Sequence, residues 1–117
     1  MDVEVADSPI EVTGPNLKIV LNDDGGAHVS LVLAIAKLPP IRHDETYEGS
    51  RTELIKDLKE GSYPCKVMIA AYKYKAVGPT YDASIRINNK VVARAEGAIK
   101  KGEWSDFGYG AFTLEVS

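Results

Sequence analysis

Residues 54–67, with the sequence LIKDLKEGSYPCKV, decide how this chain folds. Gly61 marks a sharp corner in this stretch, because glycine adopts the positive φ angles that other residues avoid. Beyond the corner, Tyr63 opens a run in which every second residue is apolar, and a period of two indicates a β-strand. The stretch therefore predicts a strand that starts at a corner of the chain.

The period of two recurs along most of the chain, and clusters of Gly, Pro, Asn and Asp separate the runs. Seven to eight short strands with turn-rich connections indicate an all-β fold rather than alternating strands and helices. At 117 residues the chain has the size of one domain, so we expect a single antiparallel β-sandwich over residues 1–117. The side chains expected to face its core are Val29, Leu31, Leu33, Ile35, Tyr63, Cys65, Val67, Ile69, Ala71, Tyr81, Ala83, Ile85, Ile87, Phe112, Leu114 and Val116.

Breaks in the pattern predict the connections. Residues 7–9 interrupt the first strand, and residues 22–26, NDDGG, form a tight turn. We expect the longest polar connection at residues 39–50 and another loop at residues 99–109. For residues 51–59 two interpretations stay open, a short helix with capping-box spacing or an edge strand.

Asn88 and Asn89 reverse the chain between two strands. We expect a three-residue loop, or a bulge with the same effect, because this register keeps one face apolar. The register pairs Ile87 with Val91, Ile85 with Ala93 and Ala83 with Ala95, and it leaves outside Ser84, Arg86, Val92 and Arg94.

Composition narrows the classes of partner and compartment. The net charge of −3, with no basic block longer than Lys100-Lys101, argues against nucleic acid and anionic membranes. No apolar run approaches the ~20 residues of a membrane-spanning helix, so we expect no membrane insertion. The first residues, MDVEVADSPIEV, lack the pattern of a signal peptide, which predicts a cytoplasmic protein or an excised or mature secreted domain. Cys65 is the single cysteine and has no partner for an internal disulfide.

The sequence predicts no catalytic residue. Cys65 falls on an inward position, where it packs as a small apolar side chain. His43 and Asp44 stand in the polar connection without other metal ligands at suitable spacing, and phosphate-binding and nucleophile motifs are missing. Asp23 and Asp24 are the one candidate carboxylate pair for calcium, which prefers oxygen ligands from loops. No other cofactor is expected.

Aromatic residues outside the core are the candidates for ligand binding. Trp104 and Tyr109 lie with Asp106 in the expected loop, and Tyr72 and Tyr74 project away from the inward row. Such side chains stack on sugar rings or anchor a protein partner.

Two short resemblances bear on the fold. The Leu58, Gly61 and Tyr63 spacing resembles that of immunoglobulin-like and fibronectin-type-III modules. The resemblance implies a sandwich of that type, in which the Tyr63 hydroxyl hydrogen-bonds back to the nearby backbone and locks the corner between the two sheets. Residues 102–116, GEWSDFGYGAFTLEV, are similar to the closing loop and strand of calcium-dependent jelly-roll lectins, which implies a sugar site. This chain has only Asp106 where those lectins carry several adjacent Asp or Asn residues.

We therefore expect a non-enzymatic binding or assembly module. Its partner is another protein or a second copy of itself, bound through outer-face and loop aromatics. The alternative is a carbohydrate-binding module that uses residues 102–110, with or without calcium.

Overall fold

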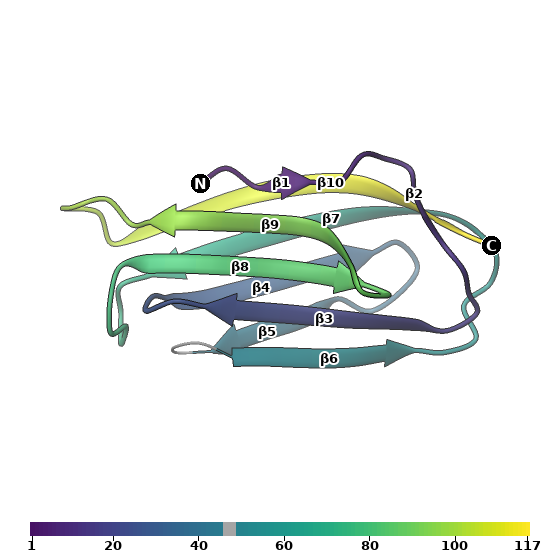
Figure 1. Ribbon diagram of the computed structural model, residues 1–117, viewed down its shortest axis with the longest axis horizontal. Coiled ribbons are helices and arrows are strands. Elements are labelled where there is room, and N and C mark those ends of the chain that lie inside the picture. The colour runs from purple at the N-terminus through teal and green to yellow at the C-terminus, as the bar shows by residue number, and fades with distance from the viewer. Residues whose placement is uncertain (46–48) are drawn as a thin grey trace.

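The computed structural model describes residues 1–45 and 49–117, and its strands form two packed sheets (Figure 1). No helix occurs among the described residues. The expected all-β sandwich is confirmed, whereas the expected count of seven to eight strands is wrong, because the described chain forms ten. In chain order these are β1 Glu4–Val5, β2 Ile10–Val12, β3 Leu17–Asp24, β4 His28–Ile35, β5 Ile41–Glu45, β6 Gly49–Ile55, β7 Gly61–Tyr72, β8 Thr80–Ile87, β9 Lys90–Ala98 and β10 Ser105–Val116.

Each sheet contains five strands. One has the order β1-β9-β8-β3-β6 and the other β2-β10-β7-β4-β5. Neighbours are antiparallel except β2, which runs parallel to β10, so the second sheet is mixed. The expectation of a purely antiparallel fold is wrong for this reason.

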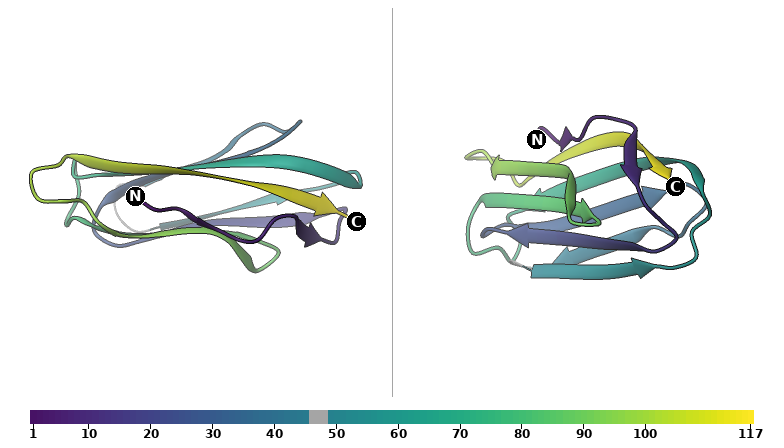
Figure 2. Two further views of the ribbon diagram at one scale, coloured as in Figure 1. Left: turned by 90° about the horizontal axis from the view of Figure 1, so that it is seen from above. Right: turned by 45° about the vertical axis from the view of Figure 1, so that its right-hand side comes forward.

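The first twelve residues account for the parallel pair, since they contribute to both sheets (Figure 2). β1 pairs with β9, the chain breaks at residues 7–9 as expected, and β2 then pairs with β10. Val5 packs against Gly110, where an added Cβ would lie 2.5 Å from Val5 Cγ2. Glycine in β10 therefore leaves the space that the N-terminal segment occupies.

The core lies between the sheets and contains every side chain predicted to face inward. The corner is confirmed as well. Gly61 has a φ of 149°, and the Tyr63 hydroxyl donates to the Lys59 carbonyl at 2.7 Å. Leu58 is buried, and its amide donates to the Pro15 carbonyl at 2.8 Å. The middle of the connection from β6 to β7 is thereby fixed to the sandwich.

Residues 51–55 belong to an edge strand, β6, which settles the two interpretations against the helix. The hairpin from β8 to β9 has the expected bulge, but its loop contains two residues, Asn88 and Asn89, both with positive φ. Ile87 pairs with Lys90 rather than Val91, and the bulge turns both Val92 and Ala93 inward. The expectation that Val92 faces outward is wrong, because the bulge opposes one extra residue of β9 to β8.

Three expected connections are shorter than predicted. β3 continues to Asp24, so the tight turn begins at Gly25. β5 forms within the polar connection, of which residues 46–48 lie outside the described residues. β10 begins at Ser105, so the last loop covers residues 99–104 only. In each case the polarity of the residues suggested a loop. They form strands because pairing with a neighbouring strand satisfies their backbone hydrogen-bonding groups.

Candidate functional site

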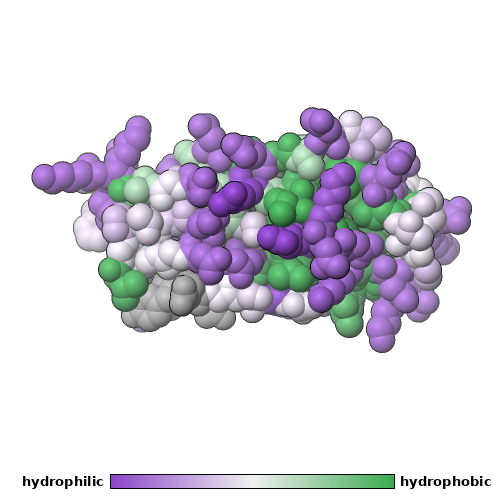
Figure 3. Space-filling model, viewed as in Figure 1, coloured by the Kyte–Doolittle hydropathy of each residue, from purple (hydrophilic) through white to green (hydrophobic). Residues whose placement is uncertain are grey.

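The outer faces of the two sheets differ in chemistry. On the sheet that contains β8 and β9, Arg94 donates to both oxygens of Asp82 at 3.2 Å and to Glu96 at 3.0 Å. Figure 3 looks onto this face and shows hydrophilic side chains across its centre, with apolar surface between them toward the right. The charges of Asp82, Arg94 and Glu96 are therefore paired within the face.

The outer face of the other sheet is apolar, and we call it the apolar face. The strand registers place its side chains in rows across β10, β7 and β4. Phe107 lies beside Ala70, and Tyr109 lies beside Met68, which in turn neighbours Val32. The apolar face comprises Val32, Ala34, Met68, Ala70, Tyr72, Phe107, Tyr109 and Ala111.

Two aromatic rings form a ridge on this face. Phe107 and Tyr109 are 58% and 68% exposed, and they stand on β10, the second strand in the order of this sheet. Their centroids lie 6.0 Å apart with an interplanar angle of 77°, an edge-to-face contact. Tyr72 lies nearer the β4 side, where its ring meets the ring of His28 edge-on at 6.0 Å.

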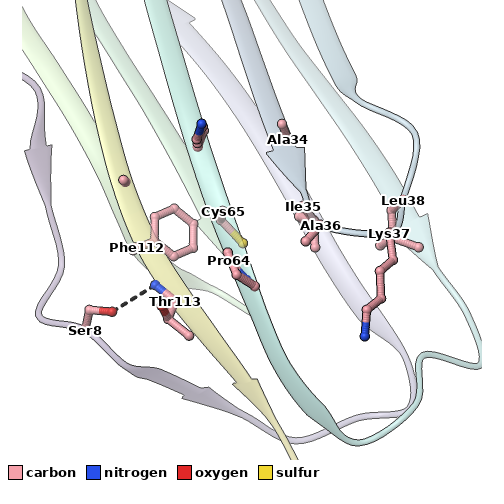
Figure 4. Close-up of a pocket in the computed structure, with 12 residues that line it drawn as sticks. Ser8, Ala34, Ile35, Ala36, Lys37, Leu38, Pro64, Cys65, Phe112 and Thr113 are labelled. Atoms are coloured by element: carbon pink, nitrogen blue, oxygen red, sulfur yellow. Dashed lines mark hydrogen bonds between the residues drawn. The ribbon is translucent and has the colours of Figure 1, made fainter.

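A hollow of about 600 Å³ extends the apolar face beyond the ridge (Figure 4). Small side chains make the depression, since Ala34, Ala36, Pro64 and Ala111 come from three neighbouring strands and the turn after β4. Lys37 lines it as well, with Nζ 5.6 Å from the centroid of the Tyr63 ring. The surface thus has an aromatic ridge at one end and an apolar depression at the other.

Positive side chains lie within and beside the apolar face. Arg42, Lys66 and Lys37 are exposed along it. Asp44 is also on this side, but its carboxylate accepts a hydrogen bond from His28 Nε2. In a chain of net charge −3 this margin is locally cationic, so it favours a partner with carboxylates around an apolar centre.

Asp106, expected in a binding loop, is partly buried at the start of β10. One carboxylate oxygen accepts from the Met1 ammonium and the other from the Tyr81 hydroxyl, each at 2.9 Å. Burial alone would raise the pKa of Asp106, but these two donors and the ammonium charge lower it below its ordinary value. Burial and the Asp106 carboxylate raise the pKa of Tyr81 to about 12. The carboxylate is therefore engaged within the molecule.

The four aromatic residues predicted to bind a ligand lie in two kinds of place, the apolar face and the connections between strands. Tyr72 and Tyr109 share the apolar face. Trp104, 76% exposed, lies in the connection from β9 to β10, and Tyr74 lies in the connection from β7 to β8. Phe107 was not among the predicted binding residues. Its position two residues before Tyr109 indicated it, since side chains at i and i+2 share one face of a strand.

The structure does not bring the candidate calcium ligands together. Asp23 is buried and Asp24 is exposed, because neighbours in a strand point to opposite faces. Asp24 accepts from the Asn22 side chain at 2.9 Å. Within residues 1–45 and 49–117, no group of three or more His, Cys, Asp and Glu side chains is arranged to hold a metal ion.

Cys65 is buried in the core, as expected from its inward position. Burial raises the pKa of its thiol to about 11, with a smaller opposing effect from the backbone of Leu114. A thiol in this state is a poor nucleophile, because the thiolate is the reactive form.

No described helix has the length and apolar character needed to cross a membrane. No protein-family model matches the chain, and no curated protein or solved structure matches it either. The apolar face is thus the candidate site that geometry alone supplies.

Proposed function

We propose that this chain is a non-enzymatic binding or assembly module whose apolar face contacts another protein. The observation that carries the proposal is the exposure of Phe107 and Tyr109 beside an apolar hollow of about 600 Å³. Contiguous apolar patches on a protein surface mark interaction sites, whereas scattered exposed apolar residues are ordinary.

The composition and the shape of the apolar face suit a protein partner. Protein interfaces are enriched in aromatic, Met and Arg side chains, and this face supplies Phe107, Tyr109, Met68 and Arg42. Anchor residues of an interface insert into well-packed pockets near its centre. The ridge offers two such anchors, and the hollow has room for an apolar side chain of the partner.

The finer fold class is also proposed, namely a sandwich of immunoglobulin-like type. Three features support it: the Tyr63 corner, the pairing of β3 with β6 in one sheet, and the neighbours β4, β7 and β10 in the other. On this assignment the β8–β9 hairpin is inserted before the last strand and joins the opposite sheet beside β3. Sandwiches of this type serve many functions, so the class does not itself identify the partner.

Carbohydrate binding is the second proposal, and the exposed indole of Trp104 supports it. The sequence also offered Asp106 as a ligand for a sugar. This support is weakened, because Met1 and Tyr81 already donate hydrogen bonds to the Asp106 carboxylate. The perpendicular rings of Phe107 and Tyr109 form no flat platform for a sugar. Titration of Trp104 fluorescence with a glycan panel, with calcium and then with chelator, tests this proposal. A saturable shift supports it and a flat response contradicts it.

The protein-contact proposal is tested with Phe107→Ser/Tyr109→Ser. Its matched control is Leu54→Ser/Val91→Ser, which removes two exposed apolar side chains from the opposite sheet. Sedimentation velocity over a concentration series measures self-association of each. Quantitative affinity capture from a native extract measures binding of other proteins.

We expect the Phe107/Tyr109 variant to lose the association that the native chain and the control retain. If both variants associate as the native chain does, the apolar face is not the contact surface. Circular dichroism of each variant verifies that it is folded.

A further inference from the structure

Two connections meet at one end of the sandwich, residues 73–79 between β7 and β8 and residues 99–104 between β9 and β10. Together they hold four lysines and one glutamate, a net charge of +3 in a chain whose total is −3. The remaining residues therefore sum to −6. The lysines, listed in chain order, are Lys73, Lys75, Lys100 and Lys101.

The charge is concentrated only after folding. In the sequence these lysines form two separated pairs, which is why the sequence argued against an anionic surface as partner. In the fold, Lys73 Nζ donates to the Lys100 carbonyl at 3.1 Å, so the two pairs lie side by side. Figure 3 shows hydrophilic side chains that project beyond the body of the molecule at its left end, where Figure 1 draws the β9–β10 connection.

Exposed apolar side chains accompany the lysines. Tyr74 is 66% exposed, Val77 is 74% exposed, and Trp104 is exposed to a similar degree. All three belong to the same two connections. We call residues 73–79 and 99–104 together the lysine–aromatic end.

The lysine–aromatic end is held in place by backbone contacts. The Lys73 amide donates to the Trp104 carbonyl at 3.0 Å, and the Ile99 amide donates to the Pro79 carbonyl at 2.9 Å. The Val77 amide donates to Gly26 of the β3–β4 turn at 2.9 Å. The backbone that carries its cationic and apolar side chains therefore does not have to be ordered when a ligand binds, which lowers the entropic cost of binding.

We propose that the lysine–aromatic end docks on the surface of a membrane that contains anionic lipids. Lysines near such a surface are attracted to its negative potential. Trp and Tyr rings settle at the level of the headgroups, and lysine stems extend along the boundary with their ammonium groups in water. The combination fits a lipid surface better than a soluble polyanion, because an exposed valine gains nothing from phosphate or sulfate groups in water.

Each lysine near the surface strengthens binding by roughly fivefold. Removing Lys100 and Lys101 together should therefore weaken binding by roughly 25-fold. Added salt should weaken binding as well, since exposed charges are screened. Docking of this kind leaves the apolar face free for a protein partner, so it goes beyond the function proposed above.

The experiment uses vesicles of phosphatidylcholine with and without phosphatidylserine. Co-sedimentation measures binding, and Trp104, the only tryptophan, reports its own environment by fluorescence. We expect binding and a blue shift of Trp104 emission with phosphatidylserine vesicles, and neither with phosphatidylcholine alone.

Matched variants separate this surface from general electrostatic attraction. Lys100→Ala/Lys101→Ala should show this roughly 25-fold weaker binding, whereas Lys18→Ala/Lys90→Ala, the same loss of charge at the opposite end, should bind as the native chain does. Val77→Ser leaves the charge unchanged and should weaken binding several-fold. Phe107→Ser/Tyr109→Ser should bind vesicles normally, so failure of the function proposed above is distinguishable from failure here.

Three results would overturn the proposal. The first is no binding to phosphatidylserine vesicles at low salt, and the second is equal loss in both lysine variants. The third is binding that leaves Trp104 emission unchanged and that heparin or nucleic acid abolishes. That result would indicate a polyanion site instead.

Discussion

The hydroxyl of Tyr81 donates a hydrogen bond of 2.9 Å to Oδ2 of Asp106, and this bond joins the two sheets from β8 to β10. Gly97 on the neighbouring strand leaves room for it, since an added Cβ would lie 2.9 Å from the Tyr81 hydroxyl. The other oxygen of Asp106 accepts from the Met1 ammonium. One carboxylate therefore ties β8, β10 and the first residue together.

Tyr81→Phe should lower the free energy of unfolding by about 2 kcal/mol, since a hydrogen bond to a charged group is lost from a largely buried position. Urea denaturation followed by circular dichroism measures the change. Tyr74→Phe is the control, because Tyr74 is exposed. Equal stability of the two variants would mean that the Asp106 bond contributes nothing.

Asp106 should make stability depend on pH in the acid range. Its pKa in the folded chain is lower than its ordinary value of 3.8, so the ionised carboxylate stabilises the fold above that pH. The stabilisation is lost as the pH falls from there through the lowered pKa. Urea denaturation over this range should show a smaller loss for Asp106→Asn than for the native chain. A parallel loss in both would assign the acid sensitivity to other carboxylates.

Tyr63→Phe should destabilise the fold by about 1–2 kcal/mol, because the Lys59 carbonyl loses its donor at the corner before β7. The ring and its packing are unchanged, so only the hydroxyl is tested. Urea denaturation measures the loss, with Tyr74→Phe again as reference. A Tyr63→Phe protein as stable as the reference would show that the corner is held by packing alone.

Gly110→Ala should destabilise the fold by about 1–3 kcal/mol, since its Cβ would lie 2.5 Å from Val5 Cγ2 and Val is stiff at χ1. Val5→Ala removes the clash, so the double variant should be less destabilised than the sum of the single variants. The four proteins form a double-mutant cycle measured by thermal or urea denaturation. Additive losses would show that β1 moves away from β10 at no cost.

Cys65 should not react with a disulfide reagent while the chain is folded. The thiol is buried and its pKa is about 11, so the thiolate fraction is small at neutral and mildly alkaline pH. Labelling with and without denaturant measures this, and one thiol should appear only on unfolding. Fast labelling of the native chain would show that β7 opens locally.

The strand pattern could be predicted because it depends on local alternation. Residues such as Val67 and Leu114 signal an inward face by their spacing alone, and Tyr63 signals the corner. The partners of short polar strands could not be predicted in this way. β5 is a strand because it pairs with β4 across residues 36–40, and the first residues of β10 are strand because they pair with β7, which is remote in the sequence.

The sequence predicted only part of the candidate site, because some of its contacts join segments that are distant in the sequence. Tyr72 was singled out from its alternation and Tyr109 as an aromatic of the expected loop, and the two do share the apolar face. Asp106 was misplaced in a loop because its two donors, Met1 and Tyr81, come from distant segments. The lysine–aromatic end was missed because residues 73–79 and 99–104 meet only in three dimensions.

The parallel pairing of β2 with β10 has a mechanical consequence. β2 and the last residues of β10 run in the same direction, and Gly14 and Ser117 continue their pairing with a hydrogen bond of 2.8 Å. A force that pulls the two ends of this chain apart would slide β2 along β10, so the bonds between them would be loaded together. The chain should therefore resist tension applied at its ends, and the bonds between β2 and β10 should break together rather than one at a time.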